Sequence, residues 1–86
     1  MKNITTLFAR NRKFYIVQNE EGFYLGIEDK YVDENGRLTK QLNGLQMKAN
    51  KDLNWCIKGI KDHVEVEYLI EQGMDPMEAI ETVCLA

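Results

Sequence analysis

Residues 13–28, KFYIVQNEEGFYLGIE, contain two runs of aromatic and β-branched residues around Asn19-Glu20-Glu21-Gly22. Four turn-type residues between two such runs predict a β-hairpin, and Gly22 can take the positive φ that closes a longer loop. Alternate residues of the second run share a face, so the sheet should have one buried and one partly exposed face. Gly26 is unusual within a strand, and it indicates a bulge or the close approach of another backbone.

Two Asn-Gly pairs follow the hairpin, one within 33–36 and one at 43–44. They predict tight turns, because Asn-Gly favours the turn geometry that matches strand twist. The chain before residue 33 can pair back across the first turn, and apolar residues alternate with polar ones over 45–49. Further strands are therefore expected in 31–49, which would give an antiparallel sheet of three to four strands.

Helical spacing follows Asn50, which is a good N-cap, and Asp52 places a negative charge in the first turn. Gly73 is a natural C′ residue, so one long helix is expected over 51–72. Its core face would be the apolar stripe Leu53, Cys56, Ile57, Ile60, Val64 and Tyr68. A weaker apolar stripe on the opposite side comprises Trp55, Gly59, Val66, Leu69 and Ile70.

A short final helix is expected over 76–85, because Asp75 can cap it and Pro76 suits its first position. Its apolar residues at helical spacing are Met77, Ile80, Val83 and Cys84. This helix can fold back over the second stripe, but its length of roughly 15 Å leaves open whether it reaches Trp55. If it does not, Trp55 and Gly59 are left for a partner.

The chain has 86 residues, which is room for a single domain, 1–86, that buries only somewhat over ~60% of the surface its unfolded chain exposes. Its composition, 44% hydrophobic and 29% charged, is typical of a globular domain. No apolar run suggests a signal peptide or the ~20 residues of a membrane span. We therefore expect an α+β domain in the cytoplasm, without membrane contact, and with reduced thiols at Cys56 and Cys84.

The net charge of −3 is distributed unevenly. Residues 1–61 hold all 11 Lys and Arg against 7 acids, whereas residues 62–86 hold 7 acids and no Lys or Arg. Such asymmetry is typical of a basic nucleic-acid face or an acidic docking face, and equally of two solvated faces that attract each other within the fold.

The nearest approach to a catalytic set is Cys56, His63 and Glu67 on the long helix. Seven residues of helix separate the thiol and the imidazole by about 10 Å, far beyond the ~3 Å that a base must reach. One histidine and two isolated cysteines do not provide the ligands of a zinc site, and none of the six glycines forms a phosphate-binding loop. We therefore expect no enzyme activity, no metal and no cofactor.

Single-stranded nucleic acid is an alternative ligand, because the segment ARNRKFY at 9–15 interleaves cations with aromatic residues. The contacts would come from Arg10, Arg12, Lys13, Tyr15 and Tyr24. A pI of 5.1 and the lack of an RNP-like or KH-like signature argue against this reading. The two C-terminal helices resemble a helix-turn-helix only in their order, because the final helix carries no base-reading side chains.

Residues 13–72 resemble the small HicB-type antitoxin domain, a partial RNase-H-like unit of hairpin, third strand and long helix. The resemblance lies in EGFY at 21–24, in LNG at 42–44 where the family has a Pro-Gly turn, and in NKDL at 50–53. The chain departs from the family in an insertion at 29–41, a second helix, and the lack of a separate DNA-binding domain. The resemblance implies an oligomer that binds another protein without chemistry of its own. The compact, acidic-ended chain is also similar to small proteins of phages and mobile elements.

The leading hypothesis is a non-enzymatic protein-interaction module, antitoxin-like or regulatory. It would form a homodimer through the stripe of Trp55, Gly59, Val66, Leu69 and Ile70, and another protein could be its partner. Two alternatives stay open. One is single-stranded nucleic-acid binding, and the other is an acidic C-terminal face that mimics nucleic acid and inhibits a basic partner.

Overall fold

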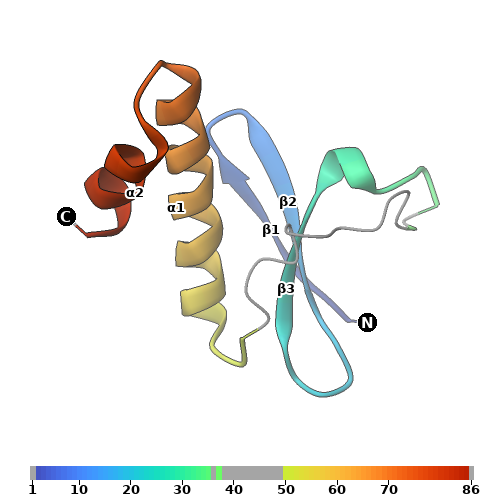
Figure 1. The fold of residues 1–86 in the computed structure, drawn as a ribbon. Helices are drawn as coiled ribbons and strands as arrows, with labels where there is room; N and C mark the ends of the chain where they lie inside the picture. Colours follow the sequence, from blue (N-terminus) through green and yellow to red (C-terminus); the bar gives the residue numbers. More distant parts are fainter. Residues whose placement is uncertain (1, 36, 38–49, 86) are drawn as a thin grey trace.

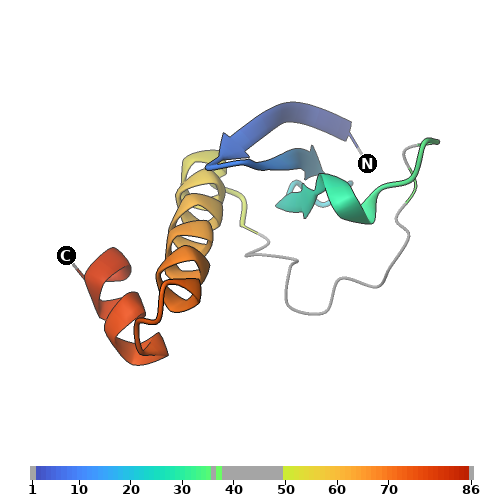
Figure 2. The ribbon, with the colours of Figure 1, turned by 90° about the horizontal axis from the view of Figure 1, so that it is seen from above.

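A computed structural model describes residues 2–35, 37 and 50–85. The described elements are β1 (Lys2–Ala9), β2 (Arg12–Gln18), β3 (Tyr24–Glu28), a 3-10 helix η1 (Asp29–Tyr31), α1 (Leu53–Glu71) and α2 (Pro76–Cys84). The strands form an antiparallel sheet in the order β1-β2-β3. Helix α1 covers one face of this sheet, and α2 packs on the side of α1 away from the sheet (Figures 1 and 2). The predicted α+β class is confirmed.

The predicted hairpin at 13–28 is formed by β2 and β3, which pair from Phe14↔Glu28 to Gln18↔Tyr24. The side-chain oxygen of Asn19 accepts hydrogen bonds from the backbone N–H groups of Glu21 and Phe23. Gly22 has a φ of +91°, as expected of the residue that closes this loop. Local turn chemistry therefore sets this hairpin.

Strand β1 adds a third strand from a segment that sequence analysis had not assigned. It pairs with β2 from Ala9↔Arg12 to Lys2↔Gln18, with an irregularity between Asn3 and Thr5. Ile4 and Leu7 are three residues apart, yet both pack against the core, because the irregularity shifts the face on which Ile4 lies. The alternation that usually reveals a strand is therefore broken in the sequence.

The further strands expected in 31–49 fall largely on residues outside those described. Within the described part, Tyr31 belongs to η1 and not to a strand, which corrects the expectation for that residue. Val32 has an extended backbone and takes part in a β-bridge. The turn at 33–36 is confirmed on its described residues. The carboxylate of Asp33 accepts from the N–H groups of Asn35 and Arg37, and the N–H of Asp33 donates to the Arg37 carbonyl at 2.8 Å.

The core lies between the sheet and α1, and its most deeply buried side chains are Ile16, Cys56 and Ile60. Gly26 of β3 sits directly beneath Ile60, since a Cβ atom added at Gly26 would lie 2.2 Å from Ile60 Cδ1. The close approach inferred from the glycine is therefore real, but it is made by a side chain of α1 and not by a backbone.

Helix α1 begins at Leu53 with Asp52 as its N-cap, two residues later than expected from Asn50. The Asp52 carboxylate accepts from the N–H of Trp55 at 3.2 Å. Asn50 instead bridges to Tyr24 at the edge of β3 and accepts from the N–H of Asp52. The strand pairing of Asn50 keeps it out of the helix.

The C-terminal end of α1 is closed by Gly73, whose φ is +102°. Its N–H donates to the Ile70 carbonyl, and the next N–H, of Met74, donates to the Leu69 carbonyl. This arrangement is a Schellman motif and confirms the predicted helix end. Helix α2 then begins as expected, with the Asp75 carboxylate accepting from the first N–H groups of the helix.

Candidate functional site

The five residues of the predicted interface stripe differ in exposure. Gly59 is buried, Val66 and Leu69 are half-buried, and only Trp55 and Ile70 are exposed, at 46% and 38%. Gly59 is therefore not left for a partner in this chain, which corrects the expectation from sequence. Within this stripe, the exposed apolar surface is contributed by Trp55 and Ile70.

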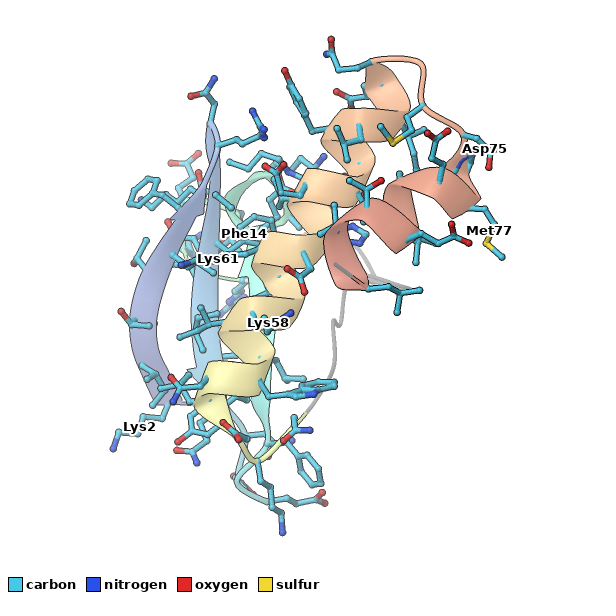
Figure 3. The ribbon with its side chains drawn as sticks, turned by 90° about the vertical axis from the view of Figure 1, so that its left-hand side faces the viewer. Lys2, Phe14, Lys58, Lys61, Asp75 and Met77 are labelled. Carbon is cyan, nitrogen blue, oxygen red and sulfur yellow. The ribbon has the colours of Figure 1, made fainter. Side chains whose placement is uncertain are left out.

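Helix α2 runs back along α1 as far as Lys58. Figure 3 shows Lys58 of α1 below the C-terminal end of α2, which ends at Cys84. Trp55 lies almost one turn further along α1, so α2 leaves it exposed. The question that the sequence left open is answered: α2 stops short of Trp55.

Helix α2 itself presents an apolar stripe to the outside. Ala79 is fully buried and Val83 is half-buried, whereas Met77, Ile80 and Cys84 are exposed. The exposed residues are spaced i, i+3, i+7 and lie on the side of the helix opposite Ala79. Met77 projects away from α1 (Figure 3). The helical spacing of these residues was visible in the sequence, but it did not show which of them face α1.

Acidic side chains surround this stripe. Glu71, Asp75, Glu78 and Glu81 are exposed, and none of the four makes an ion pair with another described residue. No helix in the described ranges is both long and apolar enough to cross a bilayer. The outer side of α2 is thus an apolar strip within a negatively charged rim.

Arg10 connects the β1–β2 turn to α1. Its Nε and Nη2 donate to the two carboxylate oxygens of Glu65 at 2.6 and 3.1 Å, and its guanidinium lies 3.5 Å from the centroid of the Tyr68 ring. The hydrogen bond to Glu65 raises the pKa of Arg10, and the same bond lowers the pKa of Glu65. Arg10 also has a φ of +52°, in the left-handed region that favours glycine.

Arg12 is held by two carboxylates. It donates to Glu28 at 2.6 and 3.1 Å and to Glu67 at 2.5 Å, and Glu28 is only 6% exposed. These bonds raise the pKa of Arg12 above its ordinary value, although burial opposes them. Burial tends to raise the pKa of Glu67, but the bond from Arg12 and the neighbouring His63 outweigh it, so the pKa of Glu67 is lowered.

The five residues predicted to contact nucleic acid are not brought together on one face. Arg10 and Arg12 are engaged by carboxylates, and Tyr24 packs against the core beneath α1. Tyr15 alternates to the other face of the sheet, where it donates to Asp29 at 2.6 Å, and Lys13 lies 5.1 Å from its ring. The basic segment is therefore divided between internal ion pairs and two faces of the sheet.

The three residues weighed above as the nearest approach to a catalytic set make other contacts. Cys56 is buried, which raises the pKa of its thiol, and Sγ approaches the Tyr24 carbonyl at 3.6 Å. His63 Nε2 lies 2.7 Å from Glu67 Oε1, but the N–H is not aligned for a hydrogen bond, so the contact is electrostatic when the imidazole is protonated. In the part of the chain that the structure describes, no group of three His, Cys, Asp or Glu could hold a metal ion.

Two shallow hollows flank Arg10 where the β1–β2 turn meets α1. One, of about 220 Å³, is lined by charged groups that include Arg12, Glu67 and Glu71. The other, of about 260 Å³, lies beside β1 and is lined by Phe8, Ala9, Arg10, Lys61, Val64 and Glu65. Sequence analysis missed both hollows, because they depend on β1 and on contacts across 55 residues.

No family model, no curated protein and no solved structure matches the chain, so the proposals that follow depend on the geometry of its own residues.

Proposed function

We propose that this chain is a non-enzymatic protein-interaction module that self-associates through its helical side. One observation carries the proposal. Of the six large apolar side chains exposed among the described residues, five lie on α1, on α2 or directly after α2: Trp55, Ile70, Met77, Ile80 and Leu85. Burying one such side chain in an interface stabilises the dimer by about 1.5–3 kcal/mol. This is a substantial free energy beside the total stability of a small domain.

The exposed apolar stripe of α2 fits a two-fold contact in which α2 packs antiparallel to α2 of a second copy. In such a contact the same patch is buried on both copies. The acidic first turn of one α2, with Asp75 and Glu78, would lie beside the opposite end of the other, where Lys58 is exposed and pairs with Asp62 at 2.6 Å. The acidic first turns of the two copies would therefore lie apart and not face each other. The HicB-type resemblance implies the same class of protein, an oligomer that binds another protein.

Sedimentation tests the proposal with two matched variants. Met77 and Phe8 are both 65% exposed, but Phe8 belongs to β1 on the sheet side. At high micromolar concentration we expect wild type and Phe8→Glu to sediment at twice the 10.0 kDa chain mass, and Met77→Glu to sediment as a monomer. A monomeric wild type, or a dimeric Met77→Glu, contradicts self-association through α2.

A second candidate function is the acidic mimic of nucleic acid. The exposed carboxylates of Glu71, Asp75, Glu78 and Glu81, without ion pairs to described residues, favour it. It predicts co-purification with a DNA-handling enzyme and release of that enzyme by salt. Glu78→Gln with Glu81→Gln should weaken such a complex; an unchanged complex contradicts the mimic. Single-stranded nucleic-acid binding has weaker support, because Arg10 and Arg12 already neutralise internal carboxylates.

A further inference from the structure

Strand β1 is an edge strand of the sheet that the described residues form. It stands first in the order β1-β2-β3, and within the described ranges only β2 pairs with it. Figure 2 shows β1 outermost in the sheet. Because the turn between β1 and β2 has two residues, Ala9 and Arg12 form a hydrogen-bonded pair, and Phe8 and Thr6 direct their N–H and C=O groups outward. Such an edge can accept a further strand.

The length of the usable edge is limited. The irregularity between Asn3 and Thr5 interrupts the strand near its start, and irregularities of this kind discourage edge pairing. From Thr5 to Ala9 the register with β2 is continuous. The regular edge therefore suits a short extended segment and not a long strand.

The hollow of about 260 Å³ lies beside this edge, where α1 overhangs β1. Val64 and Ala9 provide apolar walls, and Lys61 and Glu65 line it from α1. Alternate residues of a strand point to the same face, so the residues of an added strand that face α1 would be directed toward this hollow. It has room for an aliphatic or aromatic side chain, which makes it a pocket of the kind that gives strand addition its specificity.

The charges along the edge identify the occupant. Lys2 and Lys61 lie on the β1 side of the molecule, both exposed and without an ion pair to any described residue (Figure 3). Residues 2–9 contain one cation, Lys2, and no carboxylate. Arg10 and Arg12, which follow the strand, already pair with Glu65, Glu28 and Glu67. A second β1 therefore offers no carboxylate to Lys2 or Lys61, whereas an acidic segment of another protein does, so the acidic segment fits this edge better than a second copy.

We propose that the edge of β1 from Thr5 to Ala9 binds a short, extended, acidic segment of a partner protein. An apolar side chain of that segment fills the hollow, and a carboxylate of the segment pairs with Lys61. The inference rests on the proposed function in that both describe a protein-binding module, but it uses the side of the molecule opposite Met77 (Figure 3). The two surfaces can therefore be tested separately.

Selection from a displayed library of random nine-residue peptides tests the proposal. We expect wild-type protein to enrich peptides in which acidic and apolar residues alternate. Thr6→Pro removes one outward N–H without removing a bond to β2, and proline is tolerated on edge strands. Affinity for the enriched peptides should fall at least tenfold in Thr6→Pro and in Lys61→Glu, while amide hydrogen exchange at Thr6 and Phe8 should slow when peptide binds wild type.

Met77→Glu is the matched control and should bind the enriched peptides with wild-type affinity. The inference is overturned if basic peptides are enriched, or if wild type enriches no more peptide than Thr6→Pro does. It is also overturned if Lys61→Glu binds the enriched peptides with wild-type affinity. A fall in sedimenting mass in Thr6→Pro would make the edge a contact between copies and would also overturn it. Loss of the dimer in Met77→Glu together with failed peptide selection contradicts the β1 site alone, whereas a monomeric wild type with successful selection contradicts the α2 contact alone.

Discussion

Arg10 and Glu65 join the β1–β2 turn to α1 through two hydrogen bonds of 2.6 and 3.1 Å across 55 residues of sequence. Arg10 holds this position at a φ of +52°, which an L-residue adopts at a cost. The pairing with Glu65 and the stacking on Tyr68 offset that cost. The backbone conformation at position 10 would suit glycine better, but arginine is favoured there because its side chain contacts α1.

Replacing Arg10 separates the conformation of the turn from the contact with the helix. Arg10→Ala loses the bonds to Glu65 and keeps the unfavourable φ, whereas Arg10→Gly loses the bonds but relieves the φ. We expect both variants to unfold at lower urea concentration than wild type, with Arg10→Ala the less stable of the two. Urea unfolding followed by circular dichroism measures the order, and an Arg10→Ala variant as stable as Arg10→Gly would contradict it.

Gly26→Ala should destabilise the protein by about 1–3 kcal/mol, the usual cost of adding a methyl group to a packed core. The added Cβ would lie 2.2 Å from Ile60 Cδ1. Ile60→Val removes that atom, so the cost of Gly26→Ala should be smaller in the Ile60→Val background. Urea unfolding of the two single variants and the double variant gives the coupling. If the losses in free energy of unfolding of the two single variants simply add in the double variant, the added methyl group does not clash with Ile60.

Arg12→Leu should cost about 3 kcal/mol, because it leaves the carboxylate of Glu28 in a site that is only 6% exposed. Lys30 lies 3.9 Å from Glu28 and is too distant to replace both hydrogen bonds. Arg12→Lys keeps the positive charge but cannot donate to both carboxylates as the guanidinium does. Its free energy of unfolding should therefore lie between that of Arg12→Leu and that of wild type. Free energies of unfolding from urea titrations at pH 7 check the ranking. Equal costs for the two variants would indicate that the charge of Arg12 contributes little.

The lowered pKa of Glu67 predicts a dependence of stability on pH. Its ordinary value is 4.5, and in the folded protein the pKa lies below this. The contribution of Glu67 is therefore present above about pH 4.5 and is lost as the pH falls through the folded value. Between pH 5 and pH 3 the stability of wild type should fall more steeply than that of Glu67→Gln. Glu81→Gln, at a carboxylate without an ion pair to a described residue, should follow wild type. Identical slopes for wild type and Glu67→Gln would contradict the effect.

Trp55→Glu tests the reach of the proposed self-association. Trp55 is 46% exposed and precedes Lys58, the residue of α1 that lies below the end of α2 (Figure 3). If the contact between copies extends along α1, Trp55→Glu should sediment as a monomer, because a buried unpaired carboxylate is costly. Asn54→Glu, at the exposed neighbouring position, should remain a dimer. A dimeric Trp55→Glu would confine the contact to α2.

The elements that follow from local signals were predictable. The loop at Asn19 and Gly22, the end of α1 at Gly73, and the capped start of α2 at Asp75 each depend on a few adjacent residues. Strand β1 was not predicted, because the irregularity at Ile4 breaks its alternation. The start of α1 was placed at Asn50, because strand pairing with Tyr24 is a tertiary contact that the capping pattern does not reveal.

The candidate surfaces were predictable only in part. Helical spacing identified the apolar positions of α1 and α2, but which side of α2 faces α1 depends on packing, and Ala79 proved to be the buried residue. The basic residues near the N-terminus were visible as a cluster. That Arg10 and Arg12 are neutralised by Glu65 and Glu67 could not be inferred, since each pair spans 55 residues.

The equal separation of these two ion pairs has a consequence for insertions and deletions. Glu65 and Glu67 are two residues apart on α1, so their side chains leave the helix in directions about 200° apart around its axis. Arg10 and Arg12 therefore bind to opposite sides of α1. Adding or removing one residue within α1 ahead of Glu65 would turn both carboxylates by about 100° and break both pairs at once. A change of length between β3 and α1 leaves the pairs intact. Lineages that carry this fold should therefore vary in length ahead of α1 and keep a constant residue count within it.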